Sequence, residues 1–319
     1  MRLPRPLPRR RRTQERRRAP RPMTHVSTSV IVAIDGASAS ISALRHAKRF
    51  AEARKLRLRA VSVWSTVNTS TPFLPAGLPT EDATGLLAEV SREVFGDDLP
   101  DWYEQKAVKG STVRALLRAS RTAALLVLGS RGLGGFTGLL LGSVSAQCAA
   151  HANCPVMIIH EQNDAASLPA DAPIVVGDDG SAGSNAALEW ALQAAETFVA
   201  PVQIVRSWTI DRLPLRYEEL GFNPSSEDVN TRVLHDLVTD TQNRIERHPT
   251  VRVTREAVMA HPVAELISRS QHARLLVVGS RGRGGFARLR LGSVGAESAS
   301  YSHCPVVVVP PRANQNPNR

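Results

Sequence analysis

The chain has 319 residues, of which 42% are hydrophobic and 22% charged, as is typical of a globular protein with room for about two domains. No run approaches the roughly 18 to 20 apolar residues that span a bilayer, so no transmembrane helix and no membrane partner are predicted. The net charge of +11 would suggest nucleic-acid binding, but residues 1–22 alone hold ten Arg and one Glu. The remaining chain carries only +2, which argues against a basic folded body.

Residues 1–24 are predicted to be a disordered arginine-rich tail, and residues 312–319 a second disordered tail. A secretory or twin-arginine signal is not expected, because no apolar region follows the arginines. The first tail is either a basic arm that contacts nucleic acid or an anionic membrane, or an extension upstream of a start at Met23. Nucleic-acid binding is therefore expected only through this tail.

The first half of the chain alternates short apolar runs with segments of helical spacing. Buried strands are predicted at Ser29–Ile34, Leu58–Val63, Tyr103–Val108, Leu125–Leu128 and Val156–Ile159. Helices are predicted from Ala43 to Ala51 and around 83–97 and 112–121. The proline-broken stretch 67–82 is predicted to be a lid or an edge loop rather than a helix.

The second half repeats this alternation after a short linker at about 161–172. Its strands are predicted at Ile174–Val176, Val202–Val205, Val251–Val258, Leu275–Val278 and Val306–Val309. A second irregular stretch, 209–228, again follows a Trp and is again predicted to be a lid or an edge loop.

The two halves are copies of one domain. SVIVAIDGASAS at 29–40 matches PIVVGDDGSAGS at 173–184, an offset of 144, and the offset grows to 150 by the loops at 129–145 and 279–295. These two loops share 12 of 17 residues. Near-continuous apolar strands separated by helices predict an α/β fold of two tandem doubly wound domains, at 25–161 and 172–311. Each domain should hold a five-stranded parallel sheet flanked by helices, Rossmann-like or flavodoxin-like, with its ligand at the point where strand order reverses.

The three cysteines predict no metal or redox site. Cys148, Cys154 and Cys304 form no CxxC pair. The neighbouring His151 and His303 have no acidic residue or cysteine at a spacing typical of metal ligands. We expect small buried residues at strand entries and a reducing, cytoplasmic setting.

The duplicated loop has the spacing G-x2-G-x9-G-S, follows the fourth predicted strand and leads into a helix. Glycines let backbone N–H groups approach an anion, and the following helix directs its unpaired N–H groups to the same place. The serine hydroxyl either caps that helix or bonds a phosphate oxygen. The loop is neither a Walker A motif, since Lys is missing, nor a dinucleotide fingerprint, which follows the first strand. The alternative to a phosphate site is a tight strand-to-helix turn.

This loop, the Asp in VAIDG and VGDDG, and the CPV strands resemble the universal stress protein family in its tandem form, over about residues 25–310. The resemblance implies one ATP per domain, with Mg²⁺ as an accessory ion and no protein ligand predicted for the metal. It also implies an internal pseudo-dimer in which Val156–Ile159 meets Val306–Val309, and it allows a homodimer with further protein partners.

The resemblance also implies which residues bind nucleotide. In the first site they are Asp35, Gly129, Ser130, Arg131, Gly132, Gly142, Ser143 and Val144. In the second site they are Gly177, Asp179, Gly279, Ser280, Arg281, Gly282, Gly292, Ser293 and Val294. The aspartates are expected to line the adenosine side, although each could also be a turn residue that bonds its own backbone.

The two sites are not expected to be identical. The first copy has Gly110 after its third strand, where the second copy has Ala260 and His261. If the glycine is needed for the wall of the ligand site, the second site is the one expected to be impaired. Against this, Arg283, Arg288 and Arg290 make the second loop more basic.

Three functions are therefore open. The first is an ATP-binding regulatory or sensor protein of a stress response, without catalytic residues. The second is a slow ATPase or ATP-dependent enzyme that uses the same sites, although no paired carboxylates or metal site point to catalysis. The third is a nucleic-acid binder that depends on the tail.

Overall fold

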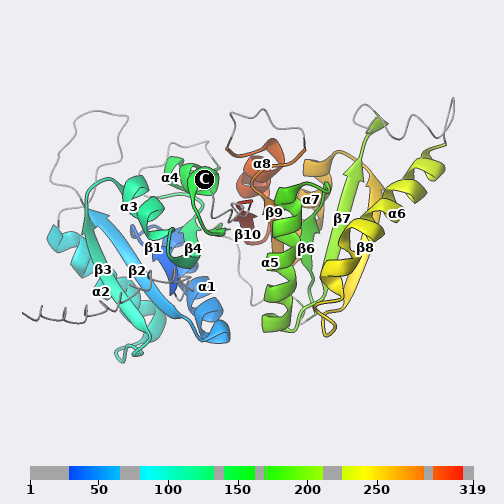
Figure 1. Ribbon diagram of the computed structural model, residues 1–319. Helices are drawn as coiled ribbons and strands as arrows, with labels where there is room; N and C mark the ends of the chain where they lie inside the picture. Colours follow the sequence, from blue (N-terminus) through cyan, green and yellow to red (C-terminus); the bar gives the residue numbers. More distant parts are fainter. Residues whose placement is uncertain are drawn as a thin grey trace, which may run out of the picture.

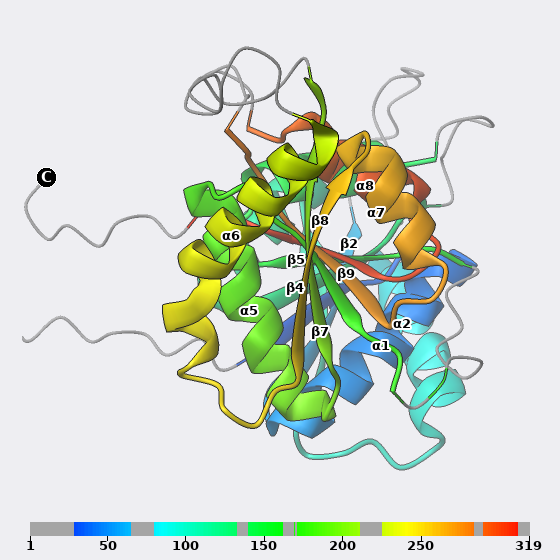
Figure 2. The same ribbon diagram turned by 90° about the vertical axis from the view of Figure 1, so that its right-hand side faces the viewer.

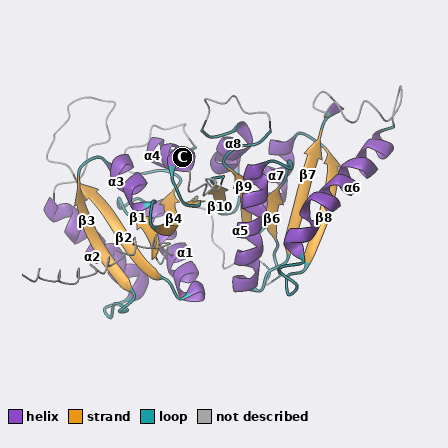
Figure 3. Cartoon of the chain, viewed as in Figure 1, coloured by secondary structure: helices purple, strands orange, loops and turns teal. Residues whose placement is uncertain are grey.

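The computed structural model describes residues 29–64, 80–132, 140–161, 169, 171–210, 225–283 and 290–311. Helices and strands alternate along these residues, which form two similar halves joined side by side (Figures 1 and 3). Among the described helices, none is long and apolar enough to cross a membrane. The predicted tails lie outside the described residues.

The first half runs from β1 to β5. Its elements are β1 (Ser29–Ala33), α1 (Ser38–Arg54), β2 (Arg57–Trp64), α2 (Thr80–Phe95), β3 (Tyr103–Lys109), α3 (Thr112–Ala119), β4 (Ala123–Gly129), α4 (Ser143–His151) and β5 (Val156–Ile159).

The second half repeats this order from β6 to β10. Its elements are β6 (Ile174–Gly177), α5 (Ala182–Phe198), β7 (Val202–Trp208), α6 (Ser226–Ile245), β8 (Val253–Met259), α7 (Pro262–Ser270), β9 (Leu275–Gly279), α8 (Ser293–Tyr301) and β10 (Val306–Val309).

The strands of the described residues form one ten-stranded sheet in the order β3-β2-β1-β4-β5-β10-β9-β6-β7-β8. Every pairing within a half is parallel, and β5 and β10 pair antiparallel across the middle, with Met157 opposite Val307. Figure 1 shows β3 at one end of the molecule, β8 at the other and β10 between the halves. The two last strands thus meet as predicted, and the α/β fold with two tandem parallel sheets is confirmed.

Alternate side chains of each strand enter two hydrophobic layers. Val30 and Val32 of β1 pack in the layer that holds α1, α2, α5 and α6, whereas Ile31 packs with α3, α4, α7 and α8. Figure 2 shows α5 and α6 on one face of the second half and α7 and α8 on the other. Both layers contain residues of both halves. Each layer includes two of the four residues of β5 and two of the four residues of β10. A sheet buried on both faces explains the near-continuous apolar runs of its strands.

Strand order reverses once in each half. The chain passes from β1 outward through β2 to β3, then returns to place β4 and β5 on the other side of β1. In the second half β6 likewise separates β7 from β9. Doubly wound proteins bind ligands beyond the carboxyl ends of the strands at such a point. We call these two places the first and the second crevice.

The two proline-broken stretches end in helices, which corrects part of the prediction. Residues 80–82 belong to α2, and α6 begins at Ser226, inside the stretch 209–228. Ser225 and Asp228 form a reciprocal capping box, in which Asp228 N donates to Ser225 Oγ at 3.1 Å and Ser225 N to Asp228 Oδ2 at 3.2 Å. Such a cap satisfies two unpaired donors and starts a helix directly after an irregular segment. Residues 67–79 and 211–224 lie outside the described residues.

Helices α1 and α5 both end on a residue in the left-handed region. Lys55 has φ 53° and Val199 has φ 50°. This backbone usually takes glycine, and a β-branched side chain is especially unfavourable there. Val199 is also 88% exposed, so burial does not compensate for its strained backbone.

We predict that Val199→Gly raises the free energy of unfolding by about 0.5 to 1 kcal/mol, because the relief of left-handed strain exceeds the entropic cost of glycine. Urea unfolding should show a higher midpoint. Val238, in the right-handed interior of α6 and 37% exposed, is the matched control, and Val238→Gly should lower the midpoint. A midpoint for Val199→Gly that is unchanged or lower would contradict this explanation.

Candidate functional site

The first reversal point brings the strand-end aspartate to the glycine loop. Asp35 follows β1, is half-buried, and accepts a hydrogen bond from Ala37 N to its Oδ1 at 3.1 Å. Gly132, three residues beyond β4, lies directly against the same carboxylate, since a Cβ on Gly132 would overlap Asp35 Oδ2. Residues 97 positions apart in the chain therefore face each other with no room for a side chain between them.

The loop is closed by backbone hydrogen bonds at its two ends. Ser130 N donates to Ile159 O of β5 at 2.7 Å, and Ser130 O accepts from Gly142 N at 2.7 Å. Ser145 Oγ adds a bond to Gly129 O at 2.7 Å. The x9 spacing of the motif thus lets the chain leave β4 and return beside it, so that α4 begins next to Ser130 and Arg131. Residues 133–139 lie outside the described residues.

Helix α4 begins without a side-chain cap. Its N-cap is Gly142, which makes no side-chain cap hydrogen bond. Ser143 is the first helical residue and is exposed, while Val144 is half-buried against the core. The interpretation of Ser143 as the helix cap is wrong, because glycine occupies the cap position. The Ser143 hydroxyl is therefore exposed at a helix start that has no side-chain cap.

The second copy reproduces this geometry. Ser280 N donates to Val309 O and Gly292 N to Ser280 O, both at 2.8 Å, and Gly292 is the uncapped N-cap of α8. Ser293 is exposed and Val294 half-buried, as in the first copy. Gly282 faces Asp179 so closely that a Cβ would overlap the Asp179 carboxylate.

Asp179 carries more hydrogen bonds than Asp35 among the described residues. Its Oδ1 accepts from Ser181 N at 3.0 Å and its Oδ2 from Arg283 N at 2.8 Å. Burial alone raises the pKa of the Asp179 carboxyl, but hydrogen bonds from Ser181, Arg283 N and Ser184 outweigh burial and hold that pKa below its ordinary value. The carboxylate is therefore charged at neutral pH and tied to both walls of the crevice.

Some of the predicted glycines have packing reasons of their own. A Cβ on Gly129 would lie 2.9 Å from the carbonyl carbon of Ala39, and one on Gly279 would lie 2.6 Å from that of Gly183. Each strand end therefore crosses the first turn of α1 or α5 at backbone contact. A Cβ on Gly177 would lie 2.8 Å from Leu266 Cδ1, so this glycine lets α7 approach β6.

The arginines of the motif are exposed at the crevice. Arg131 and Arg281 each follow the buried serine of the loop. Arg283 extends along the turn at Gly180, where a Cβ would overlap its guanidinium. Arg290 is exposed at the far end of the second loop, and Arg288 lies outside the described residues.

The two copies differ at the wall next to β3 and β8. Gly110 has φ 130°, a conformation that Ala260 does not share. Both residues donate their N–H to the Trp that ends the neighbouring strand, Gly110 to Trp64 O at 2.8 Å and Ala260 to Trp208 O at 3.1 Å. The wall is thus preserved as a backbone contact, although its conformation changes.

A partly buried ion-pair cluster beside the second site was missed by the sequence analysis. Arg206 Nε donates to Asp178 Oδ1 at 2.7 Å, and Arg206 also pairs with Asp240 of α6 at 2.9 Å. Asp178 Oδ1 further accepts from Gly180 N at 3.2 Å, so the cluster holds the turn that follows β6. Asp178 and Arg206 are each 6% exposed. Burial alone would lower the pKa of Arg206, but the two aspartates outweigh burial and hold that pKa above its ordinary value.

The first copy has no charges at the corresponding places. Offsets of 144 and 150 residues place Ile34, Ser62 and Val90 where the second copy has Asp178, Arg206 and Asp240. The available signal was a second Asp in VGDDG and an Arg inside the apolar run VQIVRSW. A single charge in a buried strand predicts a partner but does not say which residue it is.

The three cysteines are buried, as predicted. Cys154 and Cys304 are buried directly before β5 and β10, and Cys148 is buried in α4. Burial raises the pKa of each thiol to about 12. In the part of the chain that the structure describes, no group of three or more His, Cys, Asp or Glu is arranged to hold a metal ion.

The repeated crevice, closed loop and uncapped helix agree with a comparison to known families. The model of the universal stress protein family matches residues 27–160 and again residues 172–310. The chain belongs to this family. As a tandem universal stress protein it carries one family domain in each half of the sheet.

Two of the similar proteins align with nearly the whole chain and a third with less than half of it. Universal stress protein Rv2623 of Mycobacterium tuberculosis is 34% identical over 290 residues, which cover 88% of this chain and 96% of the relative. A solved universal stress protein of Archaeoglobus fulgidus aligns with 90% of this chain and 99% of its own, with a TM-score of 0.59 and 19% identity, and so shares the fold. A shorter protein of A. fulgidus, solved in complex with dAMP, aligns with 42% of this chain and 98% of its own, at 20% identity and a TM-score of 0.30.

We predict that Arg206→Met destabilises the protein by roughly 3 to 5 kcal/mol, because it leaves the Asp178 carboxylate buried without its partner. The triple variant D178I/R206S/D240V restores the residues of the first copy and should recover most of the wild-type stability. Urea unfolding of the two variants measures both effects. An Arg206→Met protein as stable as the wild type would contradict the assigned cost.

We also predict a pH-dependent difference between the wild type and Asp179→Asn. A carboxyl with a lowered native pKa stabilises the fold above its ordinary pKa of 3.8 and loses this contribution as the pH falls through the lower native value. At pH 7 the variant should be less stable by on the order of 1 kcal/mol. The difference should shrink as the pH is lowered below about 4.

Urea midpoints measured from pH 7 to pH 2 test this expectation, with Asp101→Asn at an exposed acid as the control. A difference that grows on acidification would show that the Asp179 carboxyl has a raised pKa.

Proposed function

We propose that this universal stress protein binds one ATP in each domain and works as a nucleotide-dependent regulator. The observation that supports it best is the arrangement of residues repeated at both reversal points. In each crevice a strand-end aspartate faces a loop glycine that tolerates no side chain, beside the uncapped start of a helix. This arrangement offers an acceptor at one side and a set of backbone donors at the other.

The two sides suit the two chemical parts of an adenine nucleotide. The Asp35 and Asp179 carboxylates are acceptors suited to ribose hydroxyl or base N–H donors. The helix starts at Ser143 and Ser293 suit phosphate oxygens, because their N–H groups are unpaired and the helix dipole is positive at this end. Arg131 and Arg281 add exposed positive charge beside the loops.

Mg²⁺ fits this proposal only as a companion of the phosphates. The described acids at the second crevice, Asp178 and Asp179, are already engaged by Arg206 and by loop N–H groups. A magnesium ion that keeps several waters and binds phosphate oxygens needs few protein ligands. Bound Mg²⁺ would supply neutralising charge for the phosphates.

The first experiment is to purify the protein, denature it, and identify and count the released nucleotide by chromatography. Two ATP per chain are expected. One ATP per chain would restrict the proposal to a single domain, and the variants below show which one. Release of ADP or AMP, together with turnover of added Mg-ATP, would contradict the regulator proposal and indicate a slow ATPase. No nucleotide and no uptake of Mg-ATP would overturn the proposal and leave the loops as structural turns.

We predict that Gly132→Val removes nucleotide from the first domain only, because the added side chain overlaps the Asp35 carboxylate. Gly282→Val should do the same in the second domain, and the double variant should bind none. Equilibrium dialysis with labelled ATP gives the stoichiometry of each variant. Gly85→Ala is the control, since nothing lies within 4 Å of a Cβ at this exposed position of α2.

Circular dichroism establishes that each variant is folded before dialysis. A folded Gly132→Val/Gly282→Val protein that still binds two nucleotides would contradict the assigned role of both glycines.

A further inference from the structure

The seam between the two halves contains a pocket that the proposed nucleotide sites do not use. The cavity has a volume of about 370 Å³ and is lined by described residues of both domains. Ile174 and Leu275 are the first residues of β6 and β9, and Pro305 directly precedes β10. The pocket thus lies at the amino ends of strands whose carboxyl ends form the second crevice.

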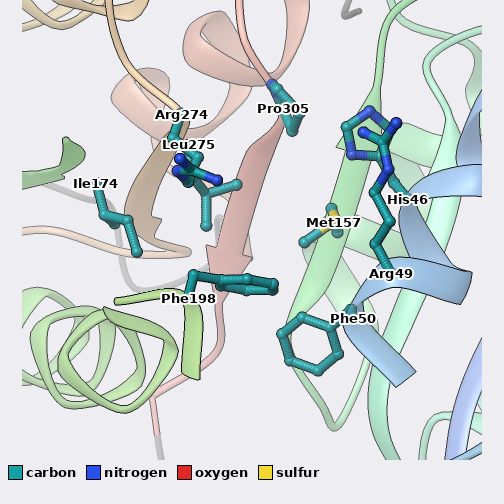
Figure 4. Close-up of a pocket in the computed structure, with 9 residues that line it drawn as sticks. All are labelled: His46, Arg49, Phe50, Met157, Ile174, Phe198, Arg274, Leu275 and Pro305. Carbon is teal, nitrogen blue, oxygen red and sulfur yellow. The ribbon is translucent and has the colours of Figure 1, made fainter. Parts of the chain in front are cut away.

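The walls of this seam pocket are mainly apolar. Figure 4 shows the rings of Phe50 and Phe198 near each other at one end, with Met157 and Leu275 above them. The ring centroids of Phe50 and Phe198 are 6.0 Å apart, which fixes the floor of the pocket across the domain boundary. Ligand sites of this kind are concave and mostly apolar, with a few polar groups that set orientation.

The polar groups of the pocket are basic. Arg49 comes from α1 of the first domain and Arg274 from the second, and Figure 4 shows their nitrogen atoms on opposite walls, with His46 beside Arg49. None of the nine described lining residues is acidic, and Arg49 forms no ion pair with any described residue. Two guanidinium groups at an apolar pocket favour a carboxylate with an apolar body.

The two arginines have no counterparts at the equivalent positions of the other copy. The 144-residue offset pairs Arg49 with Gln193, and the 150-residue offset pairs Arg274 with Ala124. Phe50 likewise corresponds to Ala194 in the other copy. The repeated fold alone therefore requires neither the arginines nor the phenyl floor at these positions.

From these observations we propose that the seam pocket binds a single-chain fatty acid, with its carboxylate between Arg49 and Arg274 and its acyl chain on Phe50, Phe198 and Met157. The volume is near the lower limit of about 300 Å³ for ligand pockets, which suits one medium-length chain and excludes a two-chain lipid. A ligand here contacts both domains, so its binding also stabilises the seam between them.

The test uses isothermal titration of the full chain with decanoate, kept below its micelle-forming concentration. Saturable binding of one decanoate per chain is expected. R49Q/R274A, which carries the residues of the other copy, should weaken binding at least tenfold, because a charge-assisted bond to each arginine is lost. Arg121→Gln, at an exposed arginine outside the pocket, is the matched charge control and should bind as the wild type does.

Two further ligands test the chemistry. Decanol, which has the chain without the charge, should bind at least tenfold more weakly than decanoate, and 1-naphthoate tests an aromatic carboxylate. Equal binding of decanol, or binding that R49Q/R274A leaves unchanged, would overturn the carboxylate assignment. If 1-naphthoate binds more tightly than decanoate, the assignment of an acyl-chain ligand is wrong. If decanoate shows no saturable binding, the proposed site is wrong.

Trp190 provides an internal reporter. Its indole stacks on Phe50, with ring centroids 5.9 Å apart and planes at 3°, so a ligand on Phe50 should change its fluorescence. The change should disappear in Trp190→Phe while decanoate still binds by calorimetry. A fluorescence change that persists in Trp190→Phe would place the ligand elsewhere.

Discussion

The antiparallel pairing of β5 with β10 is the contact on which the arrangement of the whole molecule depends. Both strands have only four residues, yet all eight side chains are buried, and their hydrogen bonds turn two five-stranded sheets into one. An end strand left unpaired would expose backbone donors and apolar side chains on both of its faces. Pairing the two copies removes both edges, and it makes the two hydrophobic layers continuous from one half to the other.

That junction also explains why the molecule has two kinds of candidate site. Each crevice belongs to one domain, because the strand-end aspartate and the glycine loop follow neighbouring strands of the same sheet. The seam pocket belongs to neither, because its walls come from α1 and β5 on one side and from α5, β6 and β9 on the other. A ligand of a crevice is held within one domain, whereas a ligand of the seam pocket contacts both.

The two copies have the same loop geometry but differ at other positions. The bonds that close the loops, Gly142 N to Ser130 O and Gly292 N to Ser280 O, agree within 0.1 Å. By contrast, the buried Arg206 and Asp178 and the exposed Asp240 stand at places that are uncharged in the first copy. Burying a charge is costly unless it is paired, so Arg206 and Asp178 require each other. The crevices are therefore alike at the loop and different at the base of the turn that follows β1 or β6.

The sequence by itself determined the local and the repeated features of this protein. Periodicity located the strands, the offsets of 144 and 150 residues revealed the duplication, and the glycine spacing predicted a loop that follows the fourth strand and leads into a helix. Strand ends, the caps at Ser225 and Gly142, and the starts of α2 and α6 were placed less well, because single hydrogen bonds decide where a helix begins.

Only the tertiary structure decided which distant residues meet. It placed Asp240 of α6 against Arg206, showed that Gly177 makes room for Leu266, and brought Arg49 and Arg274 to one pocket. A pattern within one segment reports which face of an element is buried, but not what covers that face. The covering residues depend on crossovers and on the β5–β10 junction, which bring together residues more than 200 positions apart in the chain.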